Sequence, residues 1–407
     1  MESSCTVTNY FGGSICLAAT TGYTTEIYNS IAEVPPALWH QIVPQGHTFL
    51  NYDYLNAFEL SCSGNMSFRY VVFRKDGRLA GVAAFQSILF DGNNIGNEES
   101  KKEQTLWTNL LNGVVNRMKL RILVLGNTFM TGEYGWYFTD AKVLGTEELA
   151  ALQLATQQLI KEAKQDRKPI SALLVKDTFV NNLGALPNLQ LAGYLQFPVQ
   201  PDMILDIDPI WKLFDDYLGA MSSKYRVRMR KAIKDMNGVE IRPMTIDEVQ
   251  ANLHIMEHLY QEVINSSSFK MATFELGHVP NLLRTLPANQ FWVDGFWLDG
   301  KLVAFISFYK HENQLVAGMM GMDRSAQRTF DLYLNVLLLV ARRAIENGMK
   351  QAVYGRTAME IKSSVGALPH DMYLYTRHVT GWKNRLLLPI VKRLSTSKPW
   401  HQRNPFK

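Results

Sequence analysis

The sequence predicts an α/β (α+β) protein made of two tandem units, each with a mixed, largely antiparallel central sheet flanked by helices. Residues 181–188 (NNLGALPN) and 363–370 (SSVGALPH) share Gly-Ala-Leu-Pro, and each copy follows a helical stretch and a short apolar strand. Further upstream, 73–86 (FRKDGRLAGVAAFQ) aligns with 296–309 (FWLDGKLVAFISFY). Chance similarity between two ordinary α/β segments is the alternative, but landmarks that keep their order favour duplication.

The hairpins are the first elements that this pattern predicts. In each unit an Asp-Gly pair, at Asp76 and Asp299, separates two alternating apolar runs. Both residue types tolerate the positive φ of a tight hairpin turn. In the first unit a helix over 151–168 and a strand over 171–178 follow.

The two units differ in length and are expected to meet at a proline-rich segment. The first unit is longer between its Asp-Gly and the Thr that ends the later strand, which predicts an insertion near 91–121. Three prolines between 197 and 211 break helices and central strands, so the boundary is placed near 198–210, with one short strand over 203–208. The predicted parts are an N-terminal segment (1–22), a first domain (23–200), a second domain (201–381) and a basic tail (382–407).

The second unit shows its elements in sequence. Thr245 with Glu248 three residues later forms a capping box, which begins a helix. The predicted order is helix 211–221, basic helix 222–234, strand 238–244, helix 245–267, strands 291–298, 302–311 and 314–323, helix 327–347, strand 351–357, helix 358–366 and strand 372–379.

Composition is that of a soluble globular protein with two or three domains. The chain has 407 residues, of which 47% are hydrophobic and 19% charged, and no apolar run reaches 18 residues. The N-terminus lacks the basic region of a secretory signal. Cys5, Cys16 and Cys62 fit no metal spacing and leave an odd thiol, which suits the reducing cytoplasm.

Positive charge is concentrated in two segments. The tail 382–407 has seven bases and no acid, and 222–234 has six bases, on a chain whose net charge is +5. Such clusters favour an anionic partner, for which a phosphate-bearing cofactor, tRNA and acidic lipid all qualify, whereas no DNA partner is expected. A solvated helix face is the alternative for any single base. The tail also has Trp382, Trp400 and an apolar run, which predicts contact with an anionic membrane surface at the inner face.

The element order resembles the GNAT acyltransferase fold. Residues 217–234 and 341–375 resemble the BioF2-like and Fem-like branch, whose members have two GNAT-type units in tandem, and 126–138 (GNTFMTGEYGWYF) resembles its first domain. The resemblance implies an N-acyltransferase that moves an acyl group from acyl-CoA or an acyl carrier protein thioester to an amine by direct attack. It implies no metal, no covalent enzyme intermediate and no tightly bound cofactor.

Two alternative functions remain open at the sequence level. One is a Fem-type ligase that adds an amino acid from aminoacyl-tRNA to a peptidoglycan precursor. The other is a catalytically silent protein that keeps the fold and binds lipid or RNA. No P-loop, HExxH, nucleophile elbow or GxGxxG occurs, so kinase, metalloprotease, serine hydrolase and dehydrogenase functions have no support.

The resemblance places the donor between the fourth and fifth strands of the second unit and at the following helix. The predicted donor-binding residues are Met320, Gly321, Arg324 and Arg328. The glycine-rich turn of typical GNAT enzymes is replaced by 323–329 (DRSAQRT), so Arg324 and Arg328 would have to bind phosphate with their side chains. Met residues of the fourth strand would line a tunnel or simply form core.

The densest group of chemical residues is 354–362 (YGRTAMEIK). Arg356 and Lys362 are predicted to stabilise the oxyanion, and Glu360 to take the proton from the attacking amine. An ordinary ion pair between Arg356 and Glu360 is almost as well supported. The predicted acceptor-binding residues are Glu133, Tyr134 and His370, although a plain loop residue is favoured for His370 and a surface position for His311.

Overall fold

The computed structural model describes residues 22–62, 66–91, 119–265, 276–388, 391, 395 and 399–406. Most of the predicted insertion near 91–121, together with Cys5 and Cys16, lies outside the described residues. The strands are β1 (Tyr23–Tyr28), β2 (Met66–Lys75), β3 (Arg78–Asp91), β4 (Lys119–Leu125), β5 (Trp136–Phe138), β6 (Ala172–Phe179), β7 (Leu195–Asp206), β8 (Val239–Pro243), β9 (Phe291–Leu298), β10 (Lys301–His311), β11 (Gln314–Met322), β12 (Gln351–Val353) and β13 (Leu368–His378).

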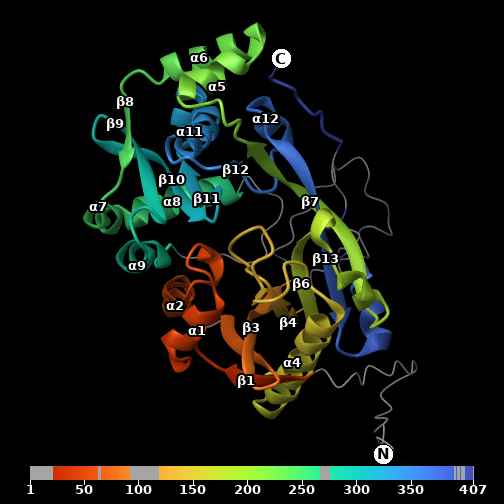
Figure 1. Cartoon of the computed structure of the whole chain (residues 1–407). Helices are drawn as coiled ribbons and strands as arrows, with labels where there is room; N and C mark the ends of the chain where they lie inside the picture. The colour runs from red at the N-terminus through yellow and green to blue at the C-terminus, as the bar shows by residue number, and fades with distance from the viewer. Residues whose placement is uncertain are drawn as a thin grey trace, which may run out of the picture.

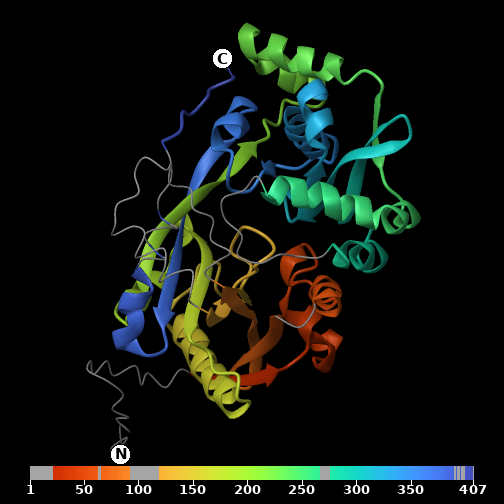
Figure 2. The same ribbon diagram turned by 180° about the vertical axis from the view of Figure 1, so that it is seen from behind.

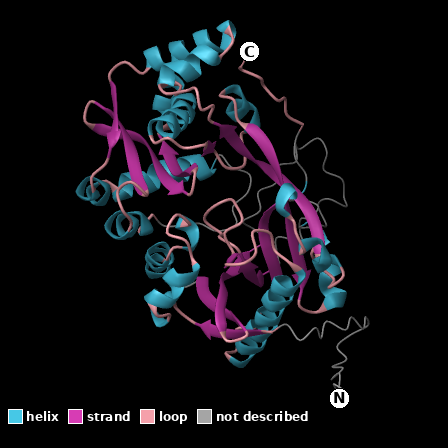
Figure 3. Ribbon diagram, in the orientation of Figure 1, coloured by secondary structure: helices cyan, strands magenta, loops and turns pink. Residues whose placement is uncertain are grey.

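Helices flank these strands (Figure 3). The first half of the chain has α1 (Pro36–Ile42), α2 (Tyr52–Ser61) and α4 (Thr146–Gln165). The second half has α5 (Phe214–Ala220), α6 (Ser223–Asp235), α7 (Ile246–Ala251), α8 (Leu253–Asn265), α9 (His278–Thr285), α10 (Arg324–Phe330), α11 (Leu332–Glu346) and α12 (Met359–Ser364). In the described part of the chain, no helix has both the length and the apolar character needed to span a bilayer.

One sheet runs through both halves of the molecule, and its strand order is symmetric. The order is β1-β2-β3-β4-β6-β13-β7-β12-β11-β10-β9-β8, with β5 paired to β3 outside this path. Among the described strands, only β4–β6 and β11–β12 pair in parallel. Because the order is the same from either end, the strands confirm the predicted mixed, largely antiparallel sheet in two repeated units.

The two units exchange their last strands. β7 follows the first unit in sequence but pairs with β12, and β13 follows the second unit but pairs with β6. β7 and β13 also pair antiparallel with each other and run side by side between the two units (Figures 1 and 2). The exchange joins the two units through backbone hydrogen bonds.

The repeated sequence landmarks are partly equivalent in structure. Asp76-Gly77 and Asp299-Gly300 all have positive φ between 49° and 79°, as the predicted hairpin turns require. Gly184 and Gly366 also both have positive φ. Beyond them the copies differ, because Leu186 begins a 3₁₀ helix whereas Leu368 begins β13.

The short strand predicted over 203–208 begins earlier in the structure. β7 continues through Pro198 and Pro201. Pairing with β13 shifts register between Val199 and Asp202, which places Pro201 at a bulge, and β12 pairs only with Ile204–Asp206. Pro198 therefore lies where β7 has a strand neighbour on one side only, a position at which a missing N–H is tolerated.

Two helices predicted as continuous are each divided. The helix predicted over 327–347 is α10 and α11, separated by Asp331 with φ +47°. The helix predicted from Thr245 onward is α7 and α8, separated at Asn252. The capping box of Thr245 and Glu248 is confirmed, with reciprocal hydrogen bonds of 3.2 and 2.9 Å.

Helices cover both faces of the sheet in each unit. In the second unit, α11 with α5 and α6 covers one face and α7–α9 the other, and in the first unit α4 lies opposite α1 and α2. α1 and α2 share one apolar core with α7–α9, so this core joins the two units.

The described end of the basic tail packs on the protein. Trp400 contacts the core of the second unit and Leu387 is 3% exposed, whereas Trp382 is 70% exposed. Trp382 is therefore the more exposed of the two tryptophans predicted to contact a membrane, and Trp400 is partly buried.

Candidate active site

The fourth and fifth strands of the second unit part after a short parallel segment. Gln314–Val316 of β11 pair with Gln351–Val353 of β12, and β12 ends there while β11 continues to Met322. From Ala317 onward, β11 pairs with β10 on one side and, among the described residues, with no strand on the other. Peptide groups on the open side are available to a bound molecule.

A cavity of about 230 Å³ lies at this separation. It is lined by β11 residues including Ala317 and Met320, by Gly355 after β12, and by Tyr260 of α8. Phe129, Met130 and Thr131 of the first unit complete its wall. The cavity is therefore built from both units.

The wall contributed by the first unit is held in place by buried polar contacts. The Asn127 side chain donates to the Tyr54 hydroxyl (2.9 Å), and the Thr128 amide donates to Gln86 Oε1 (2.8 Å). Lys176 Nζ donates to the Met130 carbonyl at 2.8 Å. These bonds fix the loop after β4, close to where β4 and β6 separate in the first unit.

Lys176 and Asp177 point inward because β6 has a bulge at this place. The pairing of β6 with β13 shifts between Val175 and Thr178, and Asp177 has φ +55°. Asp177 is fully buried and Lys176 is 3% exposed at the side chain, and the two form an ion pair. A bulge with a strained residue that re-aims charged side chains is typical of functional sites.

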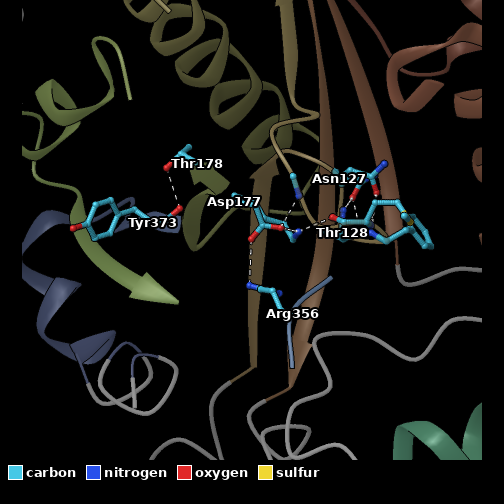
Figure 4. Close-up of polar contacts among 11 residues, drawn as sticks. Asn127, Thr128, Asp177, Thr178, Arg356 and Tyr373 are labelled. Atoms are coloured by element: carbon cyan, nitrogen blue, oxygen red, sulfur yellow. Dashed lines mark hydrogen bonds and ion pairs between the residues drawn. The ribbon is translucent and has the colours of Figure 1, made fainter. Parts of the chain in front are cut away.

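Arg356 connects this pair to the second unit. Its Nη1 donates to Asp177 Oδ1 at 3.2 Å, and Lys176 occupies the other carboxylate oxygen (Figure 4). The Arg356 side chain is 20% exposed and that of Lys176 is 3% exposed, so Arg356 is the more accessible of the two cations. Thr357 and Ala358, which follow it, have φ of +68° and +48°. A positive φ is uncommon for residues other than glycine, and most of all for a β-branched residue such as Thr357.

Lys362 lies beneath this turn and is 2% exposed. Its Nζ donates to the carbonyls of Gly355 (2.9 Å) and Arg356 (2.6 Å). Burial lowers the pKa of Lys362, and burial raises the pKa of neighbouring Asp202, while each charge favours the other. Lys362 therefore holds the backbone of Gly355 and Arg356 in place. Gly355 lines the cavity, whereas Lys362 does not.

Glu360 points elsewhere. It is half exposed and forms an ion pair with Arg403 of the C-terminal segment, with Arg403 Nε 3.1 Å from Oε1. The alternative of an Arg356–Glu360 ion pair is therefore wrong, because each residue has a different partner.

The three predicted acceptor residues have different surroundings. Glu133 accepts from the Phe179 amide (2.7 Å) and Asn182 Nδ2 (2.5 Å), and burial raises its pKa. Tyr134 is 7% exposed and packs between Phe49 and buried histidines of the core.

Two predictions about histidines are corrected. His370 lies in strand β13 opposite Asp202, and is no loop residue. His311 is 7% exposed and lies edge-on to His47 of the first unit, with ring centroids 4.7 Å apart, so it is no surface residue. The apolar core shared by the two units covers it.

Sequence reasoning missed Lys176, Asp177 and Asp202. The signal was present in 171–178 (SALLVKDT), where a charged pair ends an otherwise apolar strand. A charge in a strand that must be buried has to be paired. Arg356, the partner of Asp177 in the second unit, is 179 positions away in sequence.

Comparison with known proteins gives the family of the second unit. Residues 221–363 match the family described as "Acetyltransferase (GNAT) domain". This segment is a GNAT domain. It contains the separated strands β11 and β12, most of the residues that line the cavity between them, and Arg356, and so the predicted resemblance is confirmed.

Structural similarity extends over nearly the whole chain. FemX is similar with a TM-score of 0.53 and 12% identity, over 90% of this chain and 100% of that chain, which shows a shared fold. L-PGS from Bacillus licheniformis (TM-score 0.47, 12% identity, 88% and 96% covered) and a tandem GNAT protein from the clavulanic acid biosynthesis pathway (0.46, 11%, 87% and 98%) are also similar. No curated protein matches the chain in sequence.

The predicted donor residues occupy different surroundings in the GNAT domain. Met320 lines the cavity. A Cβ at Gly321 would lie 2.6 Å from the Tyr260 amide nitrogen, so Gly321 allows close packing of α8 on β11. Arg324 donates to the Glu262 carbonyl (3.3 Å), and Arg328 is exposed.

The start of α10 is already capped. The Asp323 carboxylate accepts from the amides of Ser325 and Ala326, both at 2.8 Å. These are the amides that a donor phosphate would use at a helix N-terminus. Donor binding at this helix therefore remains a prediction that depends on the side chains of Arg324 and Arg328.

Proposed function

We propose that the chain is an N-acyltransferase that uses acyl-CoA or an acyl carrier protein thioester as donor and an amine as acceptor. The observation that carries the proposal is the cavity at the separation of β11 and β12, where peptide groups of β11 face no described strand and where Gly355, the sequence neighbour of Arg356, forms part of the lining. Such peptide groups and a guanidinium suit a thioester carbonyl that becomes negatively charged.

The proposed step is a direct transfer. The amine nitrogen attacks the thioester carbonyl carbon, the carbonyl oxygen takes negative charge, and the C–S bond breaks as the amide forms. The thiolate leaves and the ammonium proton goes to a base. Arg356 is the proposed oxyanion partner, since it is the accessible cation of its cluster. Glu360 stays the proposed base on the condition that its carboxylate leaves Arg403, because in the structure it lines another cavity.

Fem-type ligation is the second candidate. It is supported by the fold shared with FemX over 90% of this chain. In that case the donor is an aminoacyl-tRNA ester and the acceptor amine belongs to a peptidoglycan precursor. The same cavity would receive the aminoacyl group, and the basic residues of α6 are available for phosphate contacts.

The experiment that tests the proposal is a donor screen with turnover. The full chain is mixed with acyl-CoA, acyl carrier protein or aminoacyl-tRNA and a panel of amines, and release of thiol or free tRNA is followed. The proposal expects thiol release that depends on the amine, and weaker donor binding in the Arg324→Ala/Arg328→Ala variant. Turnover with aminoacyl-tRNA alone selects the second candidate, and donor binding without turnover selects a catalytically silent protein.

A further inference from the structure

A larger cavity of about 770 Å³ lies between α6, α12 and the C-terminal segment. Its lining shares no residue with the cavity between β11 and β12. Its volume falls in the range of small-molecule sites. It is thus a second concave site in the described part of the chain.

The cavity lining is positively charged. Lys224 and Arg228 of α6 and Arg403 of the C-terminal segment line it, against the single carboxylate of Glu360. Glu360 is already paired with Arg403. Among the described residues, no carboxylate forms an ion pair with Lys224 or Arg228.

Lys224 and Arg228 are also four residues apart on one helix face. Like charges at this spacing repel and destabilise a helix slightly. Both side chains reach the same cavity, so a bound anion would remove this repulsion. Charge-assisted contacts to phosphate are the strongest that such a pair can make.

The remaining lining is aromatic and apolar. Tyr225, Trp400 and Ile361 line the cavity and pack against the core of the second unit. Flat aromatic side chains beside cations suit a ligand with a planar ring and a phosphate. An inorganic anion alone would leave this apolar surface unused.

The wall formed by the C-terminal segment is anchored at several points. The Arg403 amide donates to Ser363 Oγ (2.9 Å), and the Ser222 amide donates to the Pro405 carbonyl (2.8 Å). The Phe406 ring lies 5.2 Å from that of Trp211. The cavity wall is therefore held by contacts within the chain itself, which lowers the cost of ordering on binding.

We propose that this cavity binds a nucleotide, with its phosphates on Lys224 and Arg228 and its base against Trp400 and Tyr225. Two sources have this chemistry, a free nucleotide and the nucleotide end of a coenzyme-linked donor. The second source rests on the proposed acyl transfer, whereas the first does not.

The test is isothermal titration of the full chain with ADP, coenzyme A and inorganic diphosphate. We expect ADP or coenzyme A to bind more tightly than diphosphate, and the Lys224→Gln/Arg228→Gln variant to weaken binding about tenfold or more. Arg230→Gln/Lys234→Gln is the matched control, because these bases are exposed on the same helix at the same spacing but do not line the cavity. Trp400→Leu should weaken ADP and leave diphosphate unchanged.

The three ligands and the variants distinguish the two sources of nucleotide from each other and from failure of the proposal. Coenzyme A that displaces ADP identifies the donor end, and ADP that binds while coenzyme A does not identifies a free nucleotide. Absence of nucleotide binding to the unchanged protein, or equal weakening in both double variants, overturns the proposal. Amine-dependent thiol release can persist in either case, so the failure of this site and the failure of the proposed function are distinguishable.

Discussion

Arg356 of the GNAT domain donates a 3.2 Å hydrogen bond to Asp177 of the first unit. Asp177 is fully buried and also pairs with buried Lys176, whose Nζ fixes the Met130 carbonyl in the cavity wall. One carboxylate thus connects the proposed oxyanion partner to the wall contributed by the other unit. The first unit is therefore a structural part of the candidate site.

Asp177→Asn is expected to destabilise the protein by about 3–5 kcal/mol, because it leaves buried Lys176 without a counter-charge. Urea unfolding measures the change. Glu147→Gln is the control, since Glu147 pairs with Lys75 at the surface and its loss should cost less than about 1 kcal/mol. Equal effects of the two substitutions would contradict the structural role of Asp177.

Lys362→Met should lower kcat more than it raises KM, because the chain that positions Arg356 loses two carbonyl contacts. It also removes the cation that most favours the charged form of Asp202, so adding Asp202→Asn should recover part of the stability but not kcat. Glu360→Gln tests the proposed base and should lower kcat with little change in melting temperature, since Glu360 is exposed. Normal activity in both single variants would remove 360–362 from the mechanism.

Acid should destabilise the fold through His47 and His311. Burial lowers the pKa of His47 to about 4, and burial lowers that of His311 well below its usual value. In the unfolded chain these two histidines bind protons as the pH falls below about 6.5, whereas in the folded chain they stay neutral until the pH is much lower. The stability contribution is therefore complete above about pH 6.5 and is lost as the pH falls toward about 4, by about 2 kcal/mol at pH 5 for His47 alone.

Urea unfolding at about pH 7 and about pH 5 measures this loss for the unchanged protein and for His47→Gln. The variant should show a smaller difference between the two pH values, whatever its absolute stability. His40→Gln, at an exposed position, should leave the difference unchanged. An unaltered pH dependence in His47→Gln would contradict the account.

The sequence predicted the repeat and the hairpins because these depend on local patterns, whereas the separated strands were implied by the resemblance to the GNAT fold. The β7–β13 exchange could not be predicted, since it pairs strands about 170 residues apart. The strand predicted over 203–208 began too late in the sequence, because only tertiary pairing shows that the missing N–H groups of Pro198 and Pro201 are tolerated. The partner of Arg356 was missed for the same reason, whereas Met320 could be placed from its position on β11.

Contact of the tail with a membrane remains a prediction, and fewer exposed residues support it than the sequence suggested. Trp382, Leu386 and Leu388 are exposed beside Lys383 and Arg385, whereas Trp400 is packed on the protein. Deletion of the whole tail would also remove the wall of the larger cavity. Trp382→Ser/Leu386→Ser should therefore abolish co-sedimentation with anionic vesicles, with neutral vesicles and high salt as controls. Equal recovery in the supernatant with and without anionic lipid would contradict membrane contact.

The measurement that tests the central claim most directly is amine-dependent thiol release from acyl-CoA or acyl carrier protein by Met320→Trp. Met320 lines the cavity between β11 and β12 and is only partly buried, so the larger ring should fill the cavity without unfolding the domain. Met320→Leu is the volume-matched control. The account predicts that Met320→Trp loses about tenfold or more of kcat/KM at an unchanged melting temperature, while Met320→Leu stays near the unchanged protein. Full activity in folded Met320→Trp would contradict transfer in this cavity.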